Sequence, residues 1–413
     1  MSACTPPVPA GVAPSAAVPP SGAVHDGVAH TDAALTDAVL SALRAAGIEA
    51  AGVARAERFE GTLRDLHDRR RDGLHGGMAF TYRNPERSTD PGRILDGAQS
   101  LIVGARSYLR RPAPATESTS PQNTMAQNTM VAPGRVARYA WTDPYEPLRD
   151  ALEVGAVVLR ANGWRARVVA DSNALVDREA ARRAGIGWYG RNANLLLPGL
   201  GSWFVLGAVV TDAPLVAAQP VQPGCGTCTK CVDGCPTDAI VAPGVVDARR
   251  CIAWLVQAPG PIPRELRVEV GDRMYGCDDC QEVCPPNRAA ERRPHPAVES
   301  GGRPVVDAVT FLDDDDDTVL AAAGHWYVPR REARYLRRNA LVVLGNAGDP
   351  RDPRTVIALR RALADRDPLV RAHAVWAAGR LGRPELAEAI AATEADPMVV
   401  DELRGLAEVP SRA

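Results

Sequence analysis

Residues 225–236 read CGTCTKCVDGCP, and this stretch decides how the rest of the chain is interpreted. Its four cysteines follow the spacing CxxCxxCxxxCP, which is typical of 4Fe–4S ligation. Two residues between ligands let successive thiolates reach adjacent corners of one cubane. A shorter run, CDDCQEVCP, occupies residues 277–285 and is one cysteine short of the same pattern. The two runs together predict an iron–sulfur protein.

Two cubane clusters require eight thiolates, and Cys251, which lies between the two runs, supplies the eighth. We expect each cysteine that precedes a proline to cross over to the other cluster, as in two-cluster ferredoxins. The first cluster then has the ligands Cys225, Cys228, Cys231 and Cys284. The second has the ligands Cys235, Cys251, Cys277 and Cys280. The alternative is a pair of zinc sites, since CxxC pairs also bind zinc, but the CxxCxxCxxxCP spacing favours iron–sulfur clusters.

The composition suits a globular protein with several domains. The chain has 413 residues, a formal net charge of −2 and 46% hydrophobic residues, which is enough for two or three domains with sizeable cores. It contains no apolar run of membrane-spanning length. Eight of the nine cysteines lie between residues 225 and 284, and we find no export signal, which favours metal binding in a reducing cytoplasm. Residues 1–30 are rich in Pro, Ala and Gly and are expected to form a disordered tail.

Helical and strand patterns alternate in the first half of the chain. Helices are predicted over residues 33–47, 146–162 and 174–184, and strands over 100–109, 165–171 and 202–212. This alternation indicates an α/β domain over residues 31–212, with a flexible polar insertion at 111–134. We expect a ferredoxin-like two-cluster domain over residues 213–300.

Residues 301–413 are expected to be all-helical. RRNALVVLGNAGD at 337–349 and VRAHAVWAAGRLG at 370–382 are similar units about 33 residues apart, which indicates a HEAT-like helical repeat. Arginines outnumber acidic residues between 330 and 382 by twelve to five, so this module is basic. The acidic run at 313–317 is interpreted as a solvated loop or a helix N-terminus.

The segment before the first cysteine run, residues 170–212, is the candidate site for a bulky ligand. It has neither GxGxxG after the first strand nor GxxxxGK[ST], so ordinary dinucleotide or P-loop chemistry lacks support. Five glycines between 185 and 201 permit tight turns and a close backbone approach to such a ligand. Asp171, at the end of a predicted strand, has two interpretations: a site residue, or the N-cap of the following helix.

Motifs along the chain resemble the epoxyqueuosine reductase family. They are DSNALVDREAARRAGIGWYGRNANLL, GSW, CGTCTKCVDGCPTDAI, CIAWLVQ, YGCDDCQEVCPPN and RRNALVVLGN, preceded by MAFTYRNPERSTDPGRIL and ARYAW. The likeness covers about residues 35–385. It implies an α/β fold: a nitroreductase-like cobalamin-binding domain, with an inserted bacterial-ferredoxin-like domain for two 4Fe–4S clusters and a C-terminal HEAT-like repeat. It also implies reduction of the epoxide of epoxyqueuosine to queuosine at the tRNA anticodon wobble position.

The resemblance also assigns residues. Asp171 matches the family's proton donor, and the clusters would supply the electrons that form cob(I)alamin, whose attack on the epoxide leaves an alkoxide to be protonated. Stretches that contact cobalamin contain Arg87, Arg138, Tyr139, Asp171, Asn192, Leu195 and Ser202. The implied partners are a tRNA anticodon stem-loop and an external low-potential electron donor, with no membrane, and we expect a monomer. Phosphate contacts are expected from Arg334, Arg337, Arg338 and Arg371.

The chain departs from the family at two residues, and its insertion at 111–134 and its long N-terminal tail are also unusual for the family. Glu146, in TDPYE, replaces a histidine of the family, and Arg191 stands where the family usually has lysine. Two other functions are therefore kept as alternatives. One is a reductive dehalogenase-like corrinoid iron–sulfur enzyme, and the other is a non-catalytic iron–sulfur electron carrier with an RNA-binding module.

Overall fold

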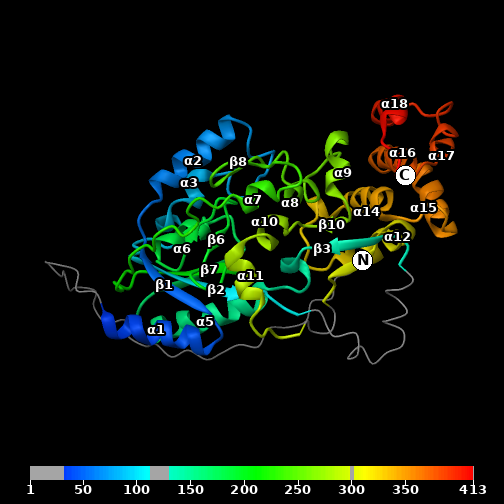
Figure 1. The fold of residues 1–413 in the computed structure, drawn as a ribbon. Coiled ribbons are helices and arrows are strands. Elements are labelled where there is room, and N and C mark those ends of the chain that lie inside the picture. Colours follow the sequence, from blue (N-terminus) through cyan, green and yellow to red (C-terminus); the bar gives the residue numbers. More distant parts are fainter. Residues whose placement is uncertain (1–31, 112–129, 298–301, 413) are drawn as a thin grey trace, which may run out of the picture.

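The first half of the chain is built on a four-stranded sheet (Figure 1), and the computed structural model describes residues 32–111, 130–297 and 302–412. The predicted disordered tail at 1–30 and most of the predicted insertion at 111–134 lie outside these residues. The sheet order is β1-β2-β7-β4, and every neighbouring pair is antiparallel. Its strands are β1 (Ala50–Arg55), β2 (Ser100–Ser107), β4 (Ala166–Ala170) and β7 (Phe204–Thr211).

Helices cover both faces of this sheet, which gives an α/β/α arrangement. α1 (Ala33–Ala45) and α5 (Tyr145–Ala161) lie on one face, and α6 (Asp177–Arg183) lies on the other. Successive strand residues point to opposite faces, so Ile102 packs in the core beneath α1 and α5. Its neighbour Val103 packs in the core beneath α6. Because both faces are buried, the central strands read as continuous apolar runs.

Shorter elements complete the first half of the chain. They are α2 (Glu60–Arg71), α3 (Pro85–Ser88), β5 (Trp188–Tyr189) and β6 (Leu195–Leu196). β5 and β6 pair with each other as an antiparallel two-stranded ladder. This ladder lies within the predicted site segment, and β7 follows it in the sequence.

A second sheet joins three distant parts of the chain. Its order is β10-β3-β11, formed by β3 (Pro133–Val136), β10 (Arg273–Tyr275) and β11 (Val305–Asp307). Residues 133 and 134 are therefore in a strand, although they were expected in a flexible insertion. The expectation that residues 301–413 are all-helical is wrong at β11, since this strand pairs with β3. Three-residue strands carry too little periodicity to be recognised in the sequence.

The cysteine segment contains only short elements. They are α7 (Lys230–Asp233), β8 (Ile240–Ala242), β9 (Val245–Val246), α8 (Ile252–Leu255), α9 (Arg267–Val270), α10 (Asp279–Glu282) and α11 (Pro285–Glu291). Most of these helices are single turns, which leave most of their backbone carbonyls without helical partners. Several of those carbonyls bond within the segment, and others accept hydrogen bonds from side chains outside it.

The C-terminal region is a stack of helices. They are α12 (Ala308–Asp313), α13 (Asp316–Ala323), α14 (Arg334–Ala347), α15 (Pro353–Leu363), α16 (Pro368–Arg380), α17 (Pro384–Glu388) and α18 (Pro397–Arg404). Asp-Pro pairs begin α15, α16 and α18, where the aspartate accepts from the helix backbone and the proline occupies the first turn. The two predicted repeat units form α14 and α16. The acidic run caps α13 through Asp315, as predicted for a helix N-terminus.

One hydrophobic core connects the three parts of the chain. It contains residues around β3, residues between Ile252 and Tyr275, and most of the helical region up to Val409. α14 crosses this core beside β10 and α9 (Figure 1). The helical region is thus packed against the cysteine segment and is not tethered by a linker alone. Among the described helices, none is long and apolar enough to cross a membrane.

The tight contact between β1 and α6 gives a test of this packing. A Cβ at Gly52 would lie 2.0 Å from the carbonyl oxygen of Ala184, so Gly52→Ala forces the helix away from the sheet. We expect it to lower the free energy of unfolding by about 1–3 kcal/mol in urea denaturation. Gly61→Ala is the control, since a Cβ there meets nothing within 4 Å. An equal loss in both variants would contradict this packing.

Candidate active site and iron–sulfur centre

Two one-turn helices, α7 and α10, bring the two cysteine runs together. They are neighbours in space, and each belongs to one CxxC run. None of the described cysteines is in a disulfide, and Cys284 is buried. The thiols are therefore available as ligands at the junction of the two runs.

The cysteines fall into two neighbourhoods according to which thiolates shift one another's pKa values. Burial raises the pKa of Cys284 to about 11, and nearby Cys231, Cys225 and Cys228 add to this shift. Burial likewise raises the pKa of Cys280, and the charges of Cys251 and Cys235, followed by that of Cys231, add to this shift.

Cys277 belongs to the second neighbourhood. Burial raises its pKa, and Asp279 and Cys251 contribute in the same direction. Buried thiols with raised pKa values ionise only when a metal centre takes up the thiolates. Among the described residues, no three His, Cys, Asp or Glu side chains converge as ligands of a single metal ion.

The second neighbourhood faces the α/β domain. The side-chain amide of Asn194 points to Cys280 Sγ at 4.0 Å, and that of Asn192 donates to the Cys280 carbonyl at 3.3 Å. Arg191 donates to the Gly226 carbonyl at 2.9 Å, which ties the same loop to the first cysteine turn. The loop at 190–194 thus contacts both cysteine runs.

Asp171 lies in an exposed turn after β4. Its φ is +50°, an uncommon value for a residue other than glycine, and half of its side chain is exposed. Its carboxylate lies 3.8 Å from Arg149 of α5. The N-cap interpretation is wrong, because α6 begins at Asp177 and its N-cap residue is Val176. The sheet is antiparallel, so the rule that places sites at the ends of parallel strands does not explain this position.

The neighbours of Asp171 come from three parts of the chain. Burial raises the pKa of Tyr145 and of Tyr275, and the charge of Asp171 adds to both shifts. Burial also raises the pKa of Asp177, where Asp171 again adds to the shift and Arg178 opposes it. Tyr145 begins α5, and Tyr275 ends β10 just before Cys277. Asp171 therefore lies near Tyr275, two residues before the second cysteine run begins at Cys277.

Arg138 contacts the second cysteine run, and Tyr139 contacts the connection that precedes it. The backbone N–H of Arg138 donates to Asp278 Oδ2 at 2.6 Å, and its guanidinium lies over the Trp203 ring at 4.9 Å. The Tyr139 hydroxyl accepts a hydrogen bond from Gln257 Nε2 at 2.8 Å. Burial raises the pKa of Asp278 to about 6, although the hydrogen bond from Arg138 opposes this shift.

Ser202 is buried in a polar network that fastens the second cysteine run to the α/β domain. Its backbone N–H donates to Asn287 Oδ1 at 2.6 Å, and Asn287 Nδ2 donates to its hydroxyl at 3.0 Å. Gln281 Nε2 donates to the Ser202 carbonyl at 3.1 Å and to the Tyr108 hydroxyl at 3.2 Å. Gln281 and Asn287 were not identified as site residues from the sequence. Their positions could have indicated them, because Gln281 directly follows Cys280 and Asn287 follows the Cys284-Pro-Pro stretch.

The remaining predicted contact residues differ in exposure. Arg87 is exposed on α3, whereas Leu195 in β6 is buried in the core beneath α6. Asn192 is also buried. Glu146 lines a small hollow of about 290 Å³ together with Tyr108 and Asp150.

Three glycines of this segment, Gly185, Gly187 and Gly201, lie close to other protein atoms, which leaves no room for a ligand beside their Cα atoms. A Cβ at Gly187 would lie 2.5 Å from the Leu196 carbonyl oxygen. At Gly185, which has a φ of +70°, it would lie 2.4 Å from the Gln219 carbonyl oxygen. At Gly201 it would lie 2.2 Å from Asn287 Oδ1. The expected close approach of these three glycines is to other segments of the chain.

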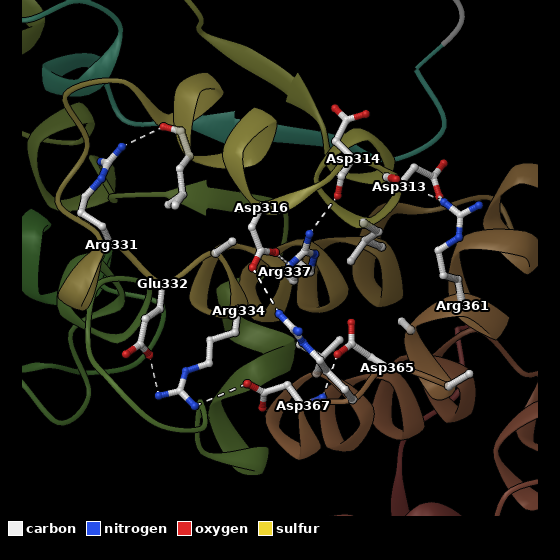
Figure 2. A pocket seen from close by; sticks show the side chains of 17 residues that line it. Asp313, Asp314, Asp316, Arg331, Glu332, Arg334, Arg337, Arg361, Asp365 and Asp367 are labelled. Carbon is white, nitrogen blue, oxygen red and sulfur yellow. Dashed lines mark hydrogen bonds and ion pairs between the residues drawn. The ribbon is translucent and has the colours of Figure 1, made fainter. Parts of the chain in front are cut away.

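The arginines expected to contact RNA phosphates are engaged within the protein. Arg338 is fully buried, so the expectation is wrong for this residue. Arg371 pairs with Glu394 at 2.7 Å. Arg334 bridges Glu332 and Asp367, and Arg337 pairs with Asp316 of the acidic run (Figure 2).

The ion pairs of Arg334 and Arg337 line a cleft of about 770 Å³ between α13, α14 and α15 (Figure 2). Arg361 pairs with Asp313 there at 2.7 Å. Acidic side chains of the run at 313–317 therefore pair with three arginines of residues 330–382, namely Arg337, Arg361 and Arg366.

Comparison with known proteins first defines a class. Residues 224–287 match the 4Fe–4S double cluster binding domain, and residues 329–408 match HEAT repeats. The chain is thus a double-cluster iron–sulfur protein with a HEAT-repeat region.

The relatives define the family. The epoxyqueuosine reductase of Bacillus anthracis is 32% identical over 345 residues, which cover 81% of this chain and 87% of the relative. An epoxyqueuosine reductase solved with an epoxyqueuosine-modified tRNA-Tyr stem loop has a TM-score of 0.79 and 28% identity, covering 91% of this chain and 98% of that chain. The Bacillus subtilis enzyme, solved with its catalytic aspartate loop swung out of the active site, matches with a TM-score of 0.79 and 28% identity, covering 91% and 99%. This chain belongs to the epoxyqueuosine reductase family, and the expected fold class is confirmed.

The polar network at Ser202 gives a test of how the cysteine run is held. Asn287→Ala leaves the Ser202 N–H and the Gln281 carbonyl buried without their partners. We expect a loss of about 2–4 kcal/mol in the free energy of unfolding, measured by urea denaturation. Asn162→Ala, at the exposed end of α5, is the control and should cost less than about 1 kcal/mol. Equal effects would contradict the role of this network.

Proposed function

We propose that this chain reduces epoxyqueuosine to queuosine at the anticodon wobble position of tRNA. Membership of the family supports the reaction class. The observation that carries the proposal for this chain is the position of Asp171, exposed in a turn beside the segment that leads to Cys277. Electrons and a proton are then available in the same region of the molecule.

The eight cysteines hold two 4Fe–4S clusters. The first cluster is bound by Cys225, Cys228, Cys231 and Cys284, and the second by Cys235, Cys251, Cys277 and Cys280. The two thiol neighbourhoods support this division. The contacts of Asn192 and Asn194 with Cys280 make the second cluster the one that faces the α/β domain.

The α/β domain binds cobalamin, which supplies a cobalt centre that low-potential clusters can reduce to a strong nucleophile. The residues present suit this cofactor. Arg87 and Asp171 offer exposed polar side chains, and about a quarter of the Arg138 side chain is exposed; such groups match the polar amides at the rim of a corrinoid. Tyr139 follows Arg138 in the sequence, and the other expected contact residues, Asn192, Leu195 and Ser202, are buried.

Asp171 delivers the proton that the opened epoxide oxygen requires. The left-handed backbone at Asp171 and its pairing with exposed Arg149 hold the carboxyl at the protein surface. The catalytic aspartate loop of the Bacillus subtilis relative has been observed swung out of its active site. We infer that the turn at Asp171 moves likewise, bringing the carboxyl to the reacting oxygen when substrate binds.

The substrate is presented by the anticodon stem-loop, as the relative solved with such a stem loop suggests. An external low-potential donor reloads the clusters after each turnover. We place the protein in the cytoplasm as a monomer, where a reducing environment keeps its thiols available.

Asp171→Asn tests the proton-donor role. The amide keeps the size of the side chain but supplies no carboxyl proton, so conversion of an epoxyqueuosine stem-loop should fall at least about 100-fold. Mass spectrometry of the nucleosides measures the product. Glu153→Gln, an exposed carboxyl of α5, should leave the rate unchanged. Full activity of Asp171→Asn would refute the role, and dehalogenation of an organohalide without stem-loop conversion would favour the dehalogenase alternative.

Cys251→Ser tests the ligand sets. We expect the iron content of the anaerobically purified chain to fall from about eight to about four atoms, since one of two cubanes is lost. Cys4→Ser is the matched control and should keep all the iron. Retention of both clusters in Cys251→Ser, by iron analysis and electron paramagnetic resonance, would contradict the assignment.

A further inference from the structure

The connection between Cys251 and Cys277 is held by the helical region, not by its own secondary structure. Residues 252–276 contain two single-turn helices, a 3-10 turn and the three-residue strand β10. Some carbonyls of this connection bond within it. Side chains of α14, more than sixty residues away from their partners in the sequence, donate to seven others: those of Leu255, Val256, Ala258, Gly260, Arg267, Gly271 and Met274.

Arg338 binds one end of this connection. It is fully buried, and its guanidinium donates to the carbonyls of Leu255 at 3.1 Å and Ala258 at 2.7 Å, and also to the carbonyl of Gly260. Cys251 is the N-cap residue of α8, the helix whose C-terminal carbonyls Arg338 binds. One helical turn therefore separates the guanidinium contacts from a predicted cluster ligand.

Asn339 binds the other end. It is also fully buried, and its Nδ2 donates to the carbonyls of Val256 at 2.8 Å and Met274 at 3.2 Å. Met274 lies in β10, three residues before Cys277. One side chain thus links the backbone next to Cys251 with the backbone next to Cys277.

Further contacts hold the middle of the connection. Asn346, two turns along α14, donates to the carbonyls of Arg267 and Gly271 at 2.7 and 3.1 Å. The N–H of Ile262 donates to Nε2 of His373, a buried residue of α16. The chain is thus fixed at several points between the two cysteines.

Arg338 carries a buried positive charge that depends on the carbonyl oxygens around it. The described contacts of its guanidinium are carbonyl and amide oxygens, together with the nearby Tyr335 ring, and no carboxylate is among them. Burial lowers its pKa to about 9. A buried charge of this kind costs free energy and is balanced only while those carbonyls converge on it. Loss of the guanidinium therefore releases the connection at the turn next to Cys251.

We propose that Arg338 and Asn339 are positioning residues for the second iron–sulfur cluster, holding Cys251 and Cys277 at the spacing that one cubane requires. The helical region is then part of the cluster-binding unit as well as a candidate RNA-binding surface. This inference rests on the ligand sets proposed above.

The test compares Arg338→Gln and Asn339→Ala with Arg337→Gln, which lies on the same helix and faces the cleft. In the two test variants we expect iron to fall from about eight to about four atoms per chain, with the paramagnetic signal of one isolated cluster remaining. Arg337→Gln should keep both clusters. Arg338→Lys keeps the charge and should restore part of the second cluster.

A second measurement uses the full-length chain stripped of iron by a chelator. Alkylation of Cys251 and Cys277 should accelerate at least about tenfold in Asn339→Ala, while alkylation of Cys225 stays unchanged, since local opening raises thiol access. Complete iron and unchanged alkylation in both test variants would overturn the proposal. Loss of both clusters together with the circular dichroism of the fold would also overturn it, because the effect would then be general unfolding.

The outcomes separate this inference from the proposed function. A wild-type chain that holds two clusters but converts no epoxyqueuosine stem-loop would refute the function and leave the inference testable by iron content. Full iron in Arg338→Gln beside normal conversion by the wild type would refute the inference alone.

Discussion

Eight thiolates must converge from a segment that has almost no regular structure of its own, and the rest of the molecule depends on this constraint. Single-turn helices leave most of their carbonyls unpaired, and unpaired buried carbonyls are costly. Buried side chains from both flanking regions supply the missing donors. Asn287 and Gln281 join the segment to Ser202 of the α/β domain, while Arg338 and Asn339 join it to the helical region.

The shared hydrophobic core joins the helical region and the cysteine segment into one packed unit. β3, β10 and β11 form one small sheet although they come from three parts of the chain. The helical region packs on this sheet and on the cysteine segment. A rigid frame on both sides keeps the spacing of the clusters constant, which a flexible linker between separate domains would not. The turn at Asp171 is outside this frame, and half of the Asp171 side chain is exposed.

Many arginines of the helical region form ion pairs within the protein, although the composition of residues 330–382 predicted a basic surface. Residues 330–382 are rich in arginine, yet the arginines near the cleft face the acidic run at 313–317 or nearby acidic side chains. Arg338 is fully buried and donates hydrogen bonds to backbone carbonyls of the cysteine segment. Net charge along a sequence window does not reveal pairing, because the partner of Arg337 lies about twenty residues earlier and that of Arg371 lies on the far side of the repeat.

The sequence by itself determined the cysteine spacing, the alternation of helices and strands, the two repeat units and the family motifs, because these depend on local periodicity and residue type. It left Asp171 as either a cap or a site residue, and the start of α6 at Asp177 excluded the cap. It did not reveal the three-residue strands, the antiparallel order of the sheet or the burial of Arg338. Those features depend on contacts between residues far apart in the chain, where partners are chosen by packing and by the need to satisfy buried polar groups.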